Sequence, residues 1–309
     1  MKRVKNNKRR ALKQDDIQAY LMMLPMLIGF ILFTVYPIMY VLRWSWFDYD
    51  GFTESTFIGL ENFIRLFTRD NRYWMSVLNT IIIAGVTAAI EIPLALILAV
   101  MINSKTKINS AFRTIFFMPS IVSIAIVGLI FSILFDGYNG IINNGLLSLN
   151  IINQSISWFS SKWLAMSVIM IASIWSHLGV NIVFFLMGLQ SVPAELYECA
   201  EIDGATGFHK FIYVTVPMLA PIMQTVIMLA IVNGMKMTDM VLVLTNGQPA
   251  GQTEVVMTYI FKYFFNYGDV ATSQLQYGYA SALATVTAII IGLITLVYLK
   301  ASDKMSKTY

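Results

Sequence analysis

Cysteine and histidine are nearly absent from this sequence. It contains one cysteine, Cys199, and two histidines, His177 and His209. A single cysteine cannot form an intramolecular disulfide, and so few scattered ligands do not make the clusters that hold zinc. The sequence therefore predicts a chain without an internal disulfide and without a metal site of its own.

Charged residues are scarce too, and the phosphate-binding loop of ATPases is missing. Asp, Glu, Lys and Arg make up 12% of the 309 residues, against roughly 25% in an ordinary soluble domain. The string Gly-x-x-x-x-Gly-Lys-Ser/Thr does not occur, so ATP hydrolysis is expected to belong to another subunit. An intramembrane enzyme is also disfavoured, because no nucleophile and base pair is visible.

Apolar residues, in contrast, are abundant and occur in long runs. They make up 57% of the sequence, and a run of about 20 apolar residues is long enough to cross a bilayer as a helix. Runs of this kind predict an all-α polytopic membrane protein with six spans, near residues 20–42, 76–102, 114–135, 165–189, 214–236 and 280–300. The first run is too long for a signal peptide and lacks a small-residue cleavage site.

The distribution of Lys and Arg predicts the orientation. Fourteen lie in the N-terminal tail, the 103–113 and 190–211 loops and the C-terminus, and seven lie in the opposite loops. The positive-inside rule then places both termini in the cytoplasm and explains the net charge of +4 without nucleic acid. We expect a basic tail over residues 1–19, a membrane domain over 20–300 and a cytoplasmic tail over 301–309.

The loop between the fourth and fifth spans, residues 193–217, carries a distinctive pattern. Pro193 suits a helix start, ten good helix formers follow, and Gly204 fits the position after a helix where φ is often positive. The helix would carry carboxylates beside small side chains, so a partner could approach closely and donate hydrogen bonds from Arg or Lys. On helix pattern alone, a solvated connector is the better interpretation.

The residue string changes that ranking, because it resembles the EAA motif of ABC importer permeases. The matching residues, with small Cys199 in place of the Ala at the second position of Glu-Ala-Ala, are Glu198, Cys199, Ala200, Asp203, Gly204, Ala205, Gly207, Phe211 and Pro217. Residues 111–119, 244–249 and 278–283 are similar to carbohydrate-uptake permeases of the same family. The resemblance covers most of the chain after residue 20.

The resemblance implies a six-helix permease with a cytoplasmic coupling helix in the bacterial plasma membrane. Its implied partners are a second permease, a cytoplasmic ATPase dimer that holds ATP and Mg, and an extracellular binding protein that delivers a sugar or oligosaccharide. No cofactor is expected in this chain. A permease for another solute and an ion-coupled secondary transporter remain alternatives.

Polar residues inside the spans are candidate sugar contacts, because such residues usually face a partner helix or a water-filled cavity. His177 and Asn181 share a helix face with Trp175 nearby, and Asn233, Lys236 and Asp239 recur at three-residue spacing. Bonds to neighbouring helices, or a pairing of Lys236 with Asp239, would explain the same residues equally well. For Glu91, in the middle of the second span, we predict a hydrogen bond to a neighbouring helix rather than proton coupling.

Overall fold

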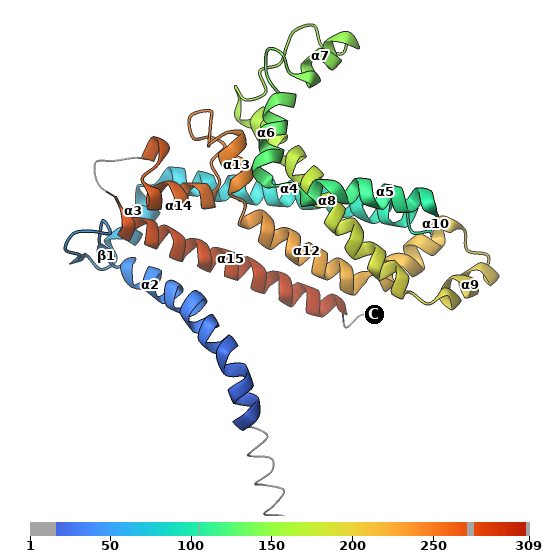
Figure 1. Cartoon of the computed structure of the whole chain (residues 1–309), viewed down its shortest axis with the longest axis horizontal. Helices are drawn as coiled ribbons and strands as arrows, with labels where there is room; N and C mark the ends of the chain where they lie inside the picture. The colour runs from blue at the N-terminus through green and yellow to red at the C-terminus, as the bar shows by residue number, and fades with distance from the viewer. Residues whose placement is uncertain (1–16, 105, 271–274, 307–309) are drawn as a thin grey trace, which may run out of the picture.

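The structure is a computed structural model that describes residues 17–104, 106–270 and 275–306. It is almost entirely helical, which confirms the predicted fold class (Figure 1). Within the described residues, four helices are long and apolar enough to cross a membrane, and two bent helix pairs bring the number to six if each pair is one span. The four helices are Ile17–Trp44, which ends as α2 (Tyr36–Trp44), α4 (Asn71–Met101), α8 (Lys162–Ser191) and α15 (Tyr277–Ser306).

The third and fifth predicted spans are not single straight helices. In the third, α5 (Lys107–Phe117) and the 3₁₀ turn η2 (Met118–Ile121) meet α6 (Ile124–Leu134) at a bend of 99°. The backbones of Val122 and Ser123 are extended there, three to four residues after Pro119. A hydropathy window measures the length of an apolar run and not the direction of the chain, so it cannot predict this bend.

The fifth span is bent by 69° between the segment Gly207–Met218 and α12 (Ala220–Met235). The first segment comprises α10 (Gly207–Lys210), the π-helical turn η3 (Phe211–Thr215) and α11 (Val216–Met218). Pro217 and Pro221 flank the break, and neither has an N–H for the helical ladder. The missing hydrogen bonds allow the chain to turn here.

Both π-helical turns in the described part of the chain precede a proline by two residues. The turn η1 (Ile31–Val35) precedes Pro37, and η3 precedes Pro217. A proline ring clashes with the carbonyl four residues earlier, which lies inside each turn, and the wider π geometry accommodates it. The two turns therefore have a common steric cause.

Helix α4 is the centre of the packing, with α8 and α12 against it. Gly234 of α12 lies so close to α4 that a Cβ there would be 2.7 Å from the Cβ of Ala84. On α8, a Cβ at Gly179 would collide with the backbone of Phe116 and Phe117. Close helix approach through small residues is the usual packing of membrane helices.

Short elements join the long helices. They are β1 (Phe47–Asp48) and β2 (Thr56–Phe57), which pair antiparallel, α3 (Glu61–Thr68), α7 (Ile141–Ser148), α13 (Asp239–Leu244), α14 (Val256–Phe265) and η4 (Gly268–Val270). The hairpin around α7 projects from the body (Figure 1). Asn143 fixes this hairpin, because its buried side chain donates to three backbone carbonyls and accepts from Ile156 N and Trp158 Nε1.

The two expected tails differ in outcome. Residues 1–16 of the N-terminal tail lie outside the described residues, and the described residues from Ile17 onward are helical. The last helix extends to Ser306, so the tail expected over 301–309 is helical for its first six residues, and the remaining three lie outside the described residues. No proline or glycine occurs after Gly292 to end the helix.

Candidate functional site

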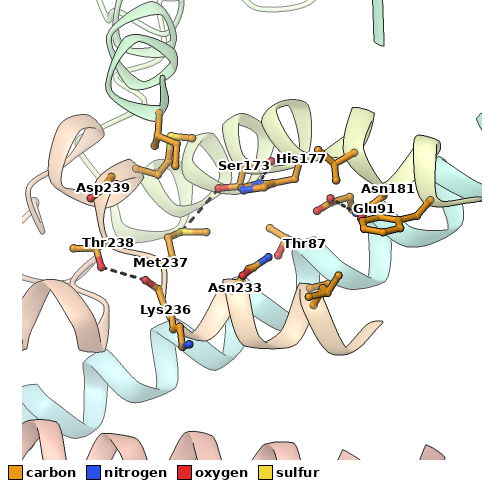
Figure 2. Close-up of a pocket in the computed structure, with 17 residues that line it drawn as sticks. Thr87, Glu91, Ser173, His177, Asn181, Asn233, Lys236, Met237, Thr238 and Asp239 are labelled. Carbon is orange, nitrogen blue, oxygen red and sulfur yellow. Dashed lines mark hydrogen bonds between the residues drawn. The ribbon is translucent and has the colours of Figure 1, made fainter. Parts of the chain in front are cut away.

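A cavity of about 490 Å³ lies between α4, α8, α12 and the loop that leads to α13 (Figure 2). Of the predicted sugar contacts, it is lined by His177, Asn181, Asn233, Lys236 and Asp239. These residues come from positions up to 62 apart in sequence, and Figure 2 shows them around one space. Among the described residues, no group of three His, Cys, Asp or Glu side chains is placed to hold a metal.

Trp175, the remaining predicted contact, does not line this cavity. Its ring packs against Phe131 of α6, with centroids 5.7 Å apart, and the side chain is 39% exposed. Two residues along a helix correspond to a rotation of about 200°, so Trp175 and His177 cannot share a face. The closeness of Trp175 to His177 in sequence therefore led to a wrong assignment of Trp175 to the cavity.

One end of the cavity is formed by Glu91 of α4 and Asn181 of α8, and both are buried. The Asn181 amide group donates to the Glu91 carboxylate, so Glu91 makes the predicted bond to a neighbouring helix. The Asn181 carbonyl oxygen does not take part in this hydrogen bond and is available to a molecule in the cavity.

His177 lies one helical turn from Asn181, at the position predicted for it. Its Nδ1 is 2.9 Å from the carbonyl oxygen of Ser173. A carbonyl oxygen cannot donate, so Nδ1 carries a proton and donates it to Ser173 O. Ser173 and Thr87 also line the cavity, and their spacing of four residues from His177 and Glu91 is the sequence signal that identifies them.

The other end of the cavity carries Asn233, Lys236 and Asp239, all exposed in this chain. Among the described ion pairs, Lys236 and Asp239 are not partners of each other or of any other residue. The pairing considered from the sequence is therefore absent. This end thus offers a cationic donor and a carboxylate acceptor that do not pair with each other.

The second predicted site, residues 193–217, contains the short helix α9 (Ala194–Ile202). Pro193 is its N-cap residue, and Gly204 follows the C-cap with φ of +78°. Gly204 N donates to Glu201 O and Ala205 N donates to Ala200 O, which is the Schellman arrangement. The glycine at this position is therefore explained by the backbone conformation.

The predicted coupling residues lie on the surface of this loop. Glu198, Cys199, Asp203, Gly204 and Gly207 are exposed, and Ala200, Ala205 and Pro217 are half-buried. Ile202 beside them is 86% exposed. A hollow of about 340 Å³ between Ala200, Gly204 and Tyr213 completes a surface with acidic, apolar and small groups.

Side-chain contacts connect α9 to the start of the fifth span. The Tyr197 and Thr215 hydroxyls are 3.0 Å apart, and Lys210 Nζ is 3.2 Å from Glu201. At the following bend, Leu219 and Ile222 pack on Gly188 of α8. These contacts thus connect α9 to the segment that leads into α12, a wall of the cavity.

A buried ion network, missed from the sequence, holds the loop before α14. Lys262 Nζ donates to Glu254 at 2.7 Å, to Asn246 O at 3.0 Å and to Asp269 at 3.1 Å. Burial alone would lower the pKa of Lys262, but the hydrogen bond and charge of Glu254, helped by Asp269, outweigh it and raise that pKa. Burial would raise the pKa of Asp269, and Lys262 instead holds it below the usual value.

Comparison with known sequences gives a family match and full-length relatives. The model of the family described as "Binding-protein-dependent transport system inner membrane component" matches residues 91–305. YesP of Bacillus subtilis (strain 168), a probable ABC transporter permease protein, is 34% identical over 300 residues, 96% of this chain and 94% of the relative. The arabinooligosaccharides transport system permease protein AraP of the same strain is 32% identical, over 92% and 88%. The trehalose/maltose transport system permease protein MalF of Thermococcus litoralis is 30% identical, over 96% and 97%.

Solved structures with the same fold include a bacterial alginate ABC transporter in complex with an alginate pentasaccharide-bound periplasmic protein. One of its chains superposes with a TM-score of 0.81 and 22% identity, covering 95% of this chain and 96% of that chain. A second structure, of a bacterial ABC transporter involved in the import of alginate, gives a TM-score of 0.80 and covers 96% and 99%. At this identity the likeness concerns the fold.

Proposed function

This chain belongs to the family of binding-protein-dependent transport system inner membrane components, and we propose that it is one of two permease subunits of a sugar-importing ABC transporter. In this proposal it forms the translocation path together with a second, homologous permease. An extracellular binding protein delivers the sugar, and a separate cytoplasmic ATPase dimer binds ATP and Mg and supplies the energy.

The observation that carries the proposal is the exposed helix α9 and its connection to the cavity. The Glu198 carboxylate, the small residues beside it and the exposed Ile202 provide a surface for a protein partner. The Tyr197 to Thr215 contact and the bend at Leu219 link this surface to α12. Closure of the ATPase dimer would move α9 and thereby tilt the wall of the cavity between inward and outward access.

Two observations support a sugar as the cargo. Named relatives that cover nearly the whole chain transport arabinooligosaccharides or trehalose and maltose. The cavity also carries amide, imidazole, ammonium and carboxylate groups, which form hydrogen bonds with hydroxyls. We assign His177, Asn181, Asn233, Lys236 and Asp239 to sugar contact and leave Trp175 to helix packing.

The orientation in this proposal follows the positive-inside rule. The chain lies in the bacterial plasma membrane with both termini and α9 in the cytoplasm, which is the side where an ATPase partner is available. The hairpin around α7 and the ion network of Lys262 then face the outside. Lipid surrounds the exposed apolar faces that the second permease does not cover.

The proposal is tested by separating transport from ATP hydrolysis in the assembled importer. We expect Glu198→Ala and Gly204→Val to reduce sugar uptake into proteoliposomes by tenfold or more, because they alter the surface and the backbone turn that receive the ATPase. ATP hydrolysis is measured on the same samples and should no longer respond to the binding protein.

Glu195→Ala is the matched control, because Glu195 lies on the same exposed helix but outside the motif. It should retain uptake close to that of the unaltered chain. Uptake that is unchanged in Glu198→Ala and Gly204→Val would be incompatible with the coupling assignment.

A further inference from the structure

A second hollow, of about 540 Å³, lies where the base of the α7 hairpin meets the loop after α13. One wall comes from the end of α6 and from the hairpin, and the other comes from the loop. The polar and aromatic residues of the lining are Ser132, Asp136, Asn139, Phe159, Thr245 and Gln248. We call this space the outer hollow and the cavity of Figure 2 the inner cavity.

The two spaces lie at opposite ends of one pair of helices. The helices α6 and α13 pack against each other (Figure 1). The inner cavity is lined by Ile124 and Asp239, at the starts of α6 and α13, and the outer hollow is lined by Ile133 and Leu244, near their ends. With six residues, α13 is about 9 Å long. In the proposed orientation, a sugar that comes from outside reaches the outer hollow first.

Both walls of the outer hollow are fixed by hydrogen bonds within the chain. Buried Asn143 donates to Asp136 O and to Ile156 O and so joins the two stems of the hairpin. In the opposite wall, the buried Thr253 hydroxyl donates to Gln248 O at 2.7 Å. The hollow is therefore formed before a ligand arrives, which lowers the cost of binding.

Two side chains in the hairpin wall have hydrogen-bonding atoms to spare. Asp136 Oδ1 accepts from Asn139 N and Tyr138 N, both at 2.9 Å, and Oδ2 has no partner among the described residues. These backbone bonds hold the pKa of Asp136 below its usual value, so the carboxylate is an ionised acceptor at neutral pH. The Asn139 side chain is also without a partner in the described part of the chain, and it can both donate and accept.

The rest of the lining adds a donor and an apolar ring. Gln248 Oε1 accepts from Ala250 N, which leaves the Gln248 amide N–H₂ for a ligand. Phe159 provides the ring, and the lining formed by the described residues contains no Lys, Arg or His. Donors and acceptors of hydrogen bonds beside one aromatic ring suit an uncharged ligand with many hydroxyls.

We propose that the outer hollow is a second sugar-binding site, which holds an uncharged sugar residue before it enters the inner cavity. Sugar hydroxyls donate to Asp136 and accept from Gln248, Asn139 does both, and the apolar face of the sugar packs on Phe159. This inference rests on the proposed sugar-importer function. It adds a site that is separate from the five sugar-contact residues of the inner cavity.

The site is tested first by protection of a cysteine, which requires no transport. Cys199→Ala removes the single native cysteine, and Ile133→Cys places a thiol in the lining at a position where the native side chain is 59% exposed. Labelling of this chain by a maleimide is measured on the assembled importer, without binding protein, in the presence and absence of maltotriose or arabinotriose. We expect the sugar to slow labelling by about threefold or more, the effect of a ligand at about twice its Kd or above.

Matched variants show whether the protection comes from the outer hollow. Leu149→Cys, 69% exposed at the end of α7 and outside the lining, should react equally fast with and without sugar. Asn139→Ala, which removes a side chain without a partner among the described residues, should abolish the protection of Ile133→Cys. Asn153→Ala, at an exposed hairpin position outside the lining, should preserve it. Labelling of Ile133→Cys that is unaffected by a sugar which the importer takes up would overturn the proposal.

Uptake of the same two sugars into proteoliposomes, with the binding protein present, separates this proposal from the sugar-importer function. Asn139→Ala should raise KM for the transported trisaccharide by about threefold or more, the loss expected from one hydrogen bond, and Asn153→Ala should not. An unchanged KM in Asn139→Ala, or uptake without protection, overturns the outer site and leaves the sugar function intact. Protection without uptake supports the site and contradicts the import function, and the absence of both contradicts both.

Discussion

At the scale of single residues, Lys262 is the most constrained charge in the described part of the chain. Its side chain is 2% exposed and compensates Glu254, which is 5% exposed and has one oxygen without a hydrogen-bond partner. We expect Lys262→Met to destabilise the protein by about 3–5 kcal/mol, because Glu254 would be left as an uncompensated buried charge. The measurement is the apparent melting temperature of the detergent-solubilised importer.

The control for this prediction is Arg72→Met, which removes a contact of the same network at the surface. Arg72 is 61% exposed and 3.1 Å from Asp269, so its loss should cost about 1 kcal/mol or less. Equal melting temperatures for the two variants would show that the buried pair is not the stabilising part of the network.

At the scale of elements, the bend between α5 and α6 depends on close contact with α8. A Cβ at Gly179 would lie 2.8 Å from the Cα of Phe117, and backbone atoms cannot move aside as a flexible side chain does. We expect Gly179→Ala to destabilise the protein by about 1–3 kcal/mol, the usual cost of overpacking. Thermal unfolding of the solubilised importer measures the change.

Gly85→Ala in α4 is the matched control for Gly179→Ala. No atom lies within 4 Å of a Cβ at this helical position, so helix propensity alone should stabilise the protein slightly, by about 0.5–1 kcal/mol. A loss of stability as large as that of Gly179→Ala would mean that the contact with Phe116 and Phe117 does not cause the loss, because Ala favours a helix at both positions.

At the scale of the whole molecule, the chain is a multi-pass membrane protein whose orientation is open to direct measurement. We expect Cys199 to react with a membrane-impermeant maleimide only after the cells are permeabilised, because α9 is placed in the cytoplasm. In a Cys199→Ala background, Tyr138→Cys should react in intact cells. The reverse pattern would invert the topology and remove α9 from the reach of a cytoplasmic ATPase.

The sequence by itself determined the properties that depend on neighbouring residues. Apolar runs located the long helices, since crossing a bilayer needs a fixed length of apolar chain. The pattern around Gly204 predicted the turn that ends α9, because positive φ favours glycine. Helical spacing likewise placed His177 and Asn181 on one face, and both line the cavity.

The tertiary structure decided what depends on contacts between distant residues. The partner of Glu91 is Asn181, 90 residues away, and Lys262 meets Glu254 only after the loop before α14 folds back. The bends of 99° and 69° and the absence of Trp175 from the cavity lining also depend on contacts between distant residues. Hydropathy and periodicity describe a helix along its own axis, whereas the packing of α4, α8 and α12 decides which faces enclose a cavity.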